Sequence, residues 1–119
     1  MATSHTRDIE LPYPYPVVID AIVHAAPSVR LKVSTVDPAR GMVFGSRGMS
    51  FFSYGLDVTV QLGQVGPTAP TRARIHSSLV FGLLDYGANR RYVERVIEAV
   101  TGWLDANAAA HRLPVPQHG

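Results

Sequence analysis

Residues 52–62 read FSYGLDVTVQL, and this stretch decides the fold. Its apolar residues take every second position: Phe52, Tyr54, Leu56, Val58, Val60 and Leu62. Polar or small residues stand between them: Ser53, Gly55, Asp57, Thr59 and Gln61. Successive side chains of a β-strand point to opposite faces of the sheet, so this period of two predicts a strand with one face in a core.

The segments on either side predict four further strands. Residues 63–70 contain two Gly and two Pro, which indicates a hairpin loop leading to a strand over residues 72–79. The sequence DPARG at residues 37–41 is a turn signal between strands over residues 31–37 and 42–47. Residues 7–11 alternate polar and apolar side chains and predict a short first strand.

Two segments carry apolar residues at helical spacing. The first covers residues 15–26 and is followed by Pro27, and the second covers residues 88–110. We therefore predict an α+β fold, a five-stranded antiparallel sheet in the order β-α-β-β-β-β-α with both helices packed on one face. A single domain should span residues 7–111, with flexible tails at 1–6 and 112–119. The expected core contains Ile19, Ile22, Leu56, Val58, Val60, Ile75, Val93, Ile97, Val100 and Leu104.

Composition excludes several functions. The formal net charge is only +2 and no run of basic residues concentrates it, so we expect no nucleic-acid partner. The 119 residues include no cysteine, and the five histidines lack the spacing of metal ligands, so we predict neither a metal site nor a cofactor. No apolar run approaches the roughly 20 residues of a membrane span. The N-terminus also lacks the apolar core of a signal peptide, which favours the cytoplasm.

Two groups of residues are candidates for function on the face of the sheet away from the helices. If the hairpin loop is centred near Gly66, Asp57 lies opposite His76. Such a pair could orient an imidazole for acid–base chemistry, although a cross-strand ion pair explains it more simply. Phe51, with Val43 nearby, should form an exposed apolar patch on the same face, and patches of this kind often mark contacts.

A resemblance adds to this prediction. The residues that carry it are Asp37 with Gly41, the pair Tyr54-Gly55, and the sequence DYGANRR at residues 85–91. Over residues 8–105 the chain resembles a group of small bacterial uncharacterised domains. It is similar in layout to BamC-type domains and, more distantly, to START-like helix-grip proteins. Helix-grip proteins typically have seven strands where this sequence predicts five, which argues against a large enclosed cavity. The resemblance implies no catalytic residues.

Two functional hypotheses follow. The first is a non-enzymatic binding or protein-interaction domain that forms a homodimer through its open sheet face and residues 49–54. The alternative is a START-like carrier or small enzyme that holds an apolar small molecule between helix 88–110 and the sheet. Its pocket would be lined by Tyr54, Tyr92 and Trp103, with His76 or Tyr54 as the acid–base group.

Overall fold

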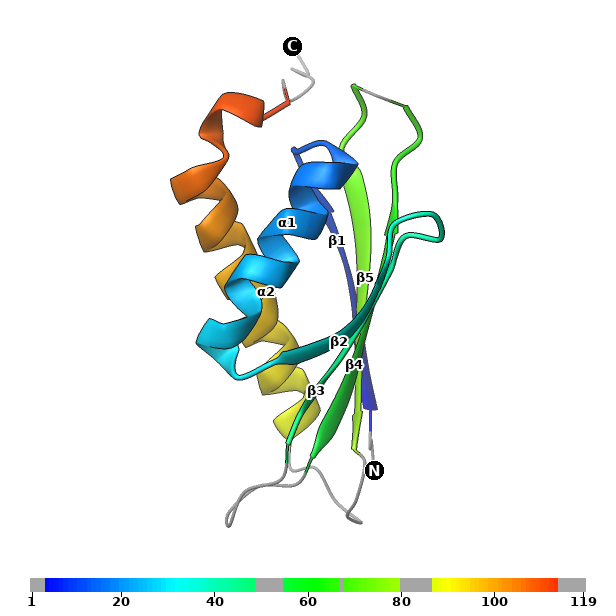
Figure 1. Cartoon of the computed structure of the whole chain (residues 1–119). Helices are drawn as coiled ribbons and strands as arrows, with labels where there is room; N and C mark the ends of the chain where they lie inside the picture. The colour runs from blue at the N-terminus through cyan, green and yellow to red at the C-terminus, as the bar shows by residue number, and fades with distance from the viewer. Residues whose placement is uncertain (1–3, 49–54, 67, 80–86, 114–119) are drawn as a thin grey trace.

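A computed structural model of the chain describes residues 4–48, 55–66, 68–79 and 87–113. Figure 1 shows two layers, a twisted antiparallel sheet and two helices that cover one of its faces. The elements are β1 (Ser4–Leu11), α1 (Tyr15–Ala25), the 3₁₀ helix η1 (Ala26–Val29), β2 (Lys32–Asp37), β3 (Met42–Arg47), β4 (Leu56–Gly63), β5 (Thr71–Leu79), α2 (Ala88–Asn107) and the 3₁₀ helix η2 (Ala109–His111). The predicted α+β class, strand order along the chain and position of both helices are confirmed.

The five strands lie in the order β1-β5-β4-β3-β2, and every neighbouring pair is antiparallel. β1 therefore pairs with β5, the last strand of the chain, and the strands from β2 to β5 each pair with the next one along the chain. β1 begins at Ser4, earlier than the predicted strand, and pairs with residues 71–78 of β5. Beyond α2, the backbone N–H of Leu113 donates to the carbonyl of Pro12 at 2.7 Å.

The turn between β2 and β3 depends on Gly41. Its φ is +67°, a left-handed conformation that residues with a Cβ rarely adopt. A Cβ at this position would also stand 2.3 Å from the carbonyl oxygen of Leu62. The close approach has a structural purpose, because the N–H of Leu62 donates to the carbonyl of Gly41 at 2.7 Å and ties the β2–β3 turn to the end of β4.

The core lies between the sheet and the helices. Of the residues predicted there, all are buried except Ile19 and Ile97, which are partly buried at its margin. Val43 corrects the prediction for β3: it is only 2% exposed and faces the helices, whereas we expected it on the open face. Met42, Val43 and Phe44 are apolar in succession, so β3 has no alternation that fixes its faces. Register places Val43 opposite the core residue Val60.

Candidate functional site

The middle of the space between the helices and the sheet is filled. The cavity left there has a volume of about 10 Å³, roughly the space of one water molecule. Only apolar side chains line it: Ile9, Leu11, Val18, Ile22, Val60, Ala73, Ile75, Val96, Ile97 and Val100. This part of the interlayer is a packed core and holds no room for a ligand.

One end of the same interlayer is polar although it remains buried. We call it the polar end and define it by Arg47, Ser77, Asn89 and Tyr92. Ser77 continues the inward face of β5 after Ala73 and Ile75, and its hydroxyl donates to the Asn89 side-chain carbonyl at 2.6 Å. Both side chains are 0% exposed. A buried polar pair of this kind is stable because each member satisfies the other in a low-dielectric setting.

Tyr92 lies one turn further along α2 than Asn89. Its ring is 2% exposed, and its hydroxyl donates to the carbonyl of Val29 at 2.8 Å. Burial raises the pKa of the Tyr92 phenol, while the charges of Arg47 and Arg95 lower it by a smaller amount. The side chain therefore keeps its proton at neutral pH and remains a hydrogen-bond donor.

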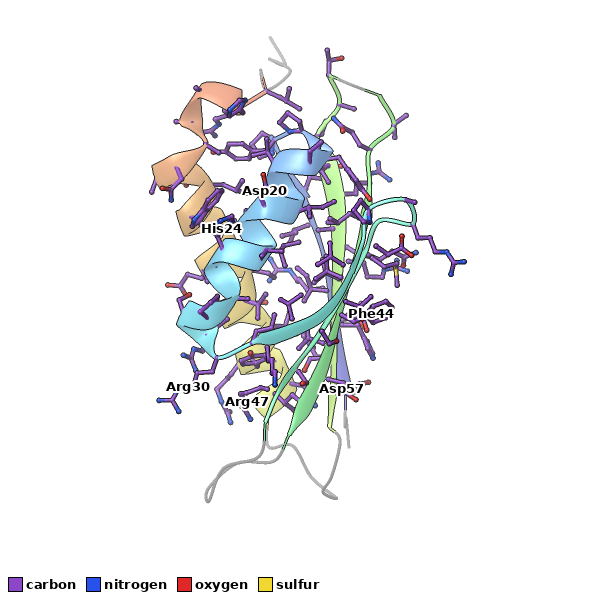
Figure 2. All side chains as sticks on the ribbon, viewed as in Figure 1. Asp20, His24, Arg30, Phe44, Arg47 and Asp57 are labelled. Carbon is purple, nitrogen blue, oxygen red and sulfur yellow. The ribbon has the colours of Figure 1, made fainter. Side chains whose placement is uncertain are left out.

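Arg47 reaches the polar end from the last position of β3. Register places it opposite Leu56 on the face that packs against the helices, and its guanidinium carbon is 5.0 Å from the centre of the Tyr92 ring. Figure 2 shows Arg47 at the same end of the molecule as Arg30. A cation over an aromatic ring is attracted by the ring's electron density, so this contact orients both side chains.

A salt bridge closes the neighbouring margin of the interlayer. Arg7 of β1 pairs with Glu94 of α2, and both side chains are about half exposed. The pair ties the edge strand to the helix at the level of Tyr92 and Val93. Glu94 thus contacts the sheet.

Trp103, predicted to line one pocket with Tyr92, lies elsewhere. It is three turns further along α2, roughly 16 Å by helix geometry. Its ring stacks on His24 of α1, with 5.2 Å between the ring centres and 18° between the planes. The His24 Nδ1 is 2.7 Å from the backbone carbonyl of Asp20, so the imidazole bonds to the helix backbone (Figure 2). In the described parts of the chain, no cluster of His, Asp and Glu could hold a metal ion.

Asp57 and His76 share the open face, as predicted, but they are not opposite one another. Asp57 pairs with Ser78, and His76 pairs with Thr59 on one side and Thr6 on the other. The His76 Nδ1 is 2.6 Å from the Thr6 hydroxyl oxygen. The predicted pairing is wrong by two residues, and a shift of two preserves the face.

The hairpin loop explains this shift. The Gln64 side-chain amide donates to the carbonyl of Ala69 at 2.9 Å, and its carbonyl accepts the backbone N–H of Tyr15 at 3.1 Å. These bonds hold a loop in which Gly63 pairs with Arg72, two residues later than the predicted pairing places its partner. His76 lies on the face away from the interlayer, beside Thr6 and Thr59. It therefore cannot serve as an acid–base group in the interlayer.

The open face is largely charged. The Arg74 guanidinium bonds to Asp8 at 2.8 Å and lowers the pKa of that carboxyl, and Arg72 lies 3.4 Å from Glu10. Its apolar residues on β3 are Met42 and Phe44, in place of the predicted Val43, and Phe44 is 38% exposed. Phe51 and Tyr54, predicted as contact residues, lie outside the described residues. Self-association through this face stays a prediction.

The described helices include none that is long and apolar enough to cross a membrane. No protein-family model and no curated protein sequence matches the chain.

Several solved structures share the fold. The di-domain ARO/CYC StfQ of the steffimycin biosynthetic pathway is similar with a TM-score of 0.67 and 9% identity, covering 87% of this chain and 46% of that one. A START superfamily protein from Mycobacterium smegmatis is similar with a TM-score of 0.64 and 9% identity, covering 88% of this chain and 99% of that one. The Zhui aromatase/cyclase from Streptomyces sp. R1128 is similar with a TM-score of 0.57 and 12% identity, covering 92% of this chain and 98% of that one. At these identities the likeness is one of architecture, and the chain has a START-like helix-grip fold.

Proposed function

We propose that this chain binds a small, largely apolar molecule at the polar end of the interlayer, between α2 and the sheet. The observation that carries the proposal is that the buried face of the sheet changes along β5 from apolar to polar side chains. Ala73 and Ile75 of β5 lie among aliphatic side chains, whereas Ser77 bonds to Asn89 beside Tyr92 and Arg47. Small-molecule sites are mostly apolar with a few convergent polar groups, and here the polar groups of Ser77, Asn89 and Arg47 lie at one end of an apolar interlayer.

The packing of the rest of the interlayer supports this location. A cavity of about 10 Å³ in its middle admits no organic molecule. The ends of four elements border the polar end: β3 ends at Arg47, β4 begins at Leu56, β5 ends at Leu79 and α2 begins at Ala88. A ligand at this point enters between element ends and need not separate paired strands.

Binding without catalysis fits the groups present. His76 lies on the opposite face of the sheet beside Thr6. Tyr92 holds its proton through burial, and its hydroxyl is committed to the Val29 carbonyl. Among the described interlayer residues, no side chain is placed to take a proton from a substrate near neutral pH. The function proposed is therefore that of a carrier. The aromatase/cyclases and the START superfamily protein that share the fold support a role toward small molecules, as an analogy of architecture.

A titration with phenylnaphthylamine, a neutral apolar fluorophore, tests this function. We expect saturable binding of one fluorophore per chain. Replacing both members of the buried pair, with Ser77→Leu and Asn89→Leu, fills the polar end with apolar volume. The affinity should then fall about tenfold or more, equivalent to about 1.4 kcal/mol.

Ser78→Leu is the matched control, because Ser78 is the next residue of β5 and faces the other side of the sheet. It should leave the affinity unchanged. Circular dichroism of each variant verifies that it folds. A wild type that does not bind the fluorophore, or a folded double variant that binds it equally well, would refute the proposed site.

A further inference from the structure

The sheet has two edge strands, β1 and β2, and among the described residues neither has a strand on its outer side (Figure 1). An edge strand presents backbone N–H and C=O groups that can pair with another strand. β2 is six residues long and reads KVSTVD, from Lys32 to Asp37. All six residues are exposed or partly exposed, so the outer side of β2 is accessible to a further strand.

A β-bulge decides which residues of β2 share a face. The register with β3 skips Ser34, between Val33 and Thr35, and the Ser34 hydroxyl donates to the carbonyl of Phe44 at 3.2 Å. An extra residue of this kind shifts the alternation of the strand. The open face therefore carries Lys32, Thr35 and Asp37, whereas Val33 and Val36 point to the side of the helices.

This arrangement makes β2 complementary to a second copy of itself. Opposite residues of an antiparallel pair share a face, and a two-fold axis repeats each contact. One register around such an axis places Lys32 opposite Asp37 of the second copy and Val33 opposite Val36 of the second copy. The two bulges then meet at the centre. Opposite charges and apolar side chains are thus each matched twice.

The side chains at this edge are available for such a contact. Among the described residues, no carboxylate lies within ion-pair distance of Lys32. Asp37 contacts Arg40 at 3.7 Å, but the Arg40 side chain is 83% exposed, so this ion pair is weak. Val36 is exposed although it points to the side of the helices, and Val33 of a second copy would cover it.

The other edge strand, β1, lacks this complementarity. Its charged residues on the open face are Asp8 and Glu10, both acidic, and they already pair with Arg74 and Arg72 of β5. A second copy of β1 would bring these like charges together, which disfavours pairing. β2 instead carries one charge of each sign, at opposite ends of the strand. The charge pattern therefore favours β2 as the edge that pairs.

We infer that the chain forms a two-fold symmetric dimer in which two β2 strands pair antiparallel and join the two five-stranded sheets into one continuous sheet. The contact lies at the edge of the sheet and not on its open face, and it does not depend on the proposed ligand. Six residues per copy are fewer than the roughly 20–30 residues a side of a standard interface, so the dimer should be weak, with a Kd of about 100 µM.

Charge reversal at the two ends of β2 tests the inference, with light scattering from about 10 µM to 1 mM protein and no ligand present. Lys32→Glu places carboxylates opposite one another twice, so the dimer should weaken about tenfold or more. Asp37→Lys should weaken it in the same way. A mixture of the two single variants restores opposite charges at every position, so the mixed dimer should form within about threefold of the wild-type Kd.

The mixture also separates charge pairing from damage to the turn, because Asp37 accepts the backbone N–H of Arg40 at 3.3 Å. Arg90→Glu is the matched control. It makes the same change in formal charge at an exposed residue of α2 and should leave the Kd unchanged. Circular dichroism verifies that each variant folds.

A wild type that remains monomeric at about 1 mM would overturn the inference and leave the proposed ligand site standing. So would a mixture that associates no better than either single variant. A dimer that Lys32→Glu leaves intact and Phe44→Asp abolishes would place the contact on the open face, and would also overturn the pairing through β2.

Discussion

Tyr92→Phe tests whether the polar end is buried as the structure has it. The substitution removes one hydroxyl and leaves the Val29 carbonyl, its partner at 2.8 Å, without a donor inside the fold. The lost bond and the unsatisfied buried acceptor together should cost about 1–3 kcal/mol of the free energy of unfolding at neutral pH. Urea unfolding followed by Trp103 fluorescence measures this difference, because Trp103 is the single tryptophan of the chain.

The pH dependence of this difference in unfolding free energy between the wild type and Tyr92→Phe adds a sharper test. Burial raises the pKa of Tyr92 above its ordinary value of 10.0 in the folded chain. Above pH 10 the unfolded chain releases a proton that the folded chain retains, so the wild type loses stability as pH rises toward the folded pKa. The loss approaches about 1.4 kcal/mol per pH unit, and the Phe variant lacks it. The difference in unfolding free energy between the two proteins should therefore be constant below pH 10 and decrease above it. A gap that stays constant into the alkaline range would show that Tyr92 is exposed.

Three further predictions concern the fold and the open face. Leu104→Ala should cost about 2–5 kcal/mol in urea unfolding because Leu104 is 0% exposed, and Ile97→Ala should cost less because Ile97 is partly buried; the reverse order would contradict the described packing of α2. Gly41→Ala should cost about 2 kcal/mol or more in the same assay, since its Cβ would meet the Leu62 carbonyl at a positive φ, and an unchanged midpoint would refute this turn geometry. Phe44→Asp should leave the fold intact and weaken any self-association through the open face; light scattering that finds the wild type monomeric at every concentration would reject a dimer there.

The architecture could be predicted because the periodic segments are unambiguous. The alternation over residues 52–62 assigned the inward face of β4 correctly, and Leu56, Val58 and Val60 are all buried. The apolar stripe of residues 88–110 likewise placed Val93, Val100 and Leu104 in the core. In each case a single period extends over several repeats, so one face of the element is apolar however the neighbours are arranged.

The errors fall where local pattern leaves two arrangements equivalent. β3 offers apolar residues to both faces, so the position of Val43 is fixed only by pairing with Val60. The pairing of Asp57 depends on the width of the hairpin loop, which the Gln64 side chain sets through bonds to Ala69 and to Tyr15 of another element. Contacts of this kind come from tertiary structure, and the sequence of the hairpin alone does not contain them.

The candidate site was predicted in part for the same reason. Tyr92 was identified from its place on the apolar face of α2, but Trp103 on the same stripe packs against His24 three turns away. Ser77 appears as an inward position of β5, and only its bond to Asn89 reveals a buried polar pair. Val29 and Arg95 line one hollow through the packing of η1 on α2, which no spacing in the sequence indicates.

A nuclear magnetic resonance titration with phenylnaphthylamine tests the proposed binding site most directly. Amide shifts should change at the polar end, at Arg47, Ser77, Asn89 and Tyr92, because the ring current of a bound aromatic molecule acts over a few ångströms. The open face supplies an internal comparison, since Gln61, Arg72 and Arg74 line a groove of about 530 Å³ on the other side of the sheet. Saturable changes confined to the polar end are the result we predict. Changes concentrated along Gln61, Arg72 and Arg74, or none at saturating fluorophore, would contradict the account.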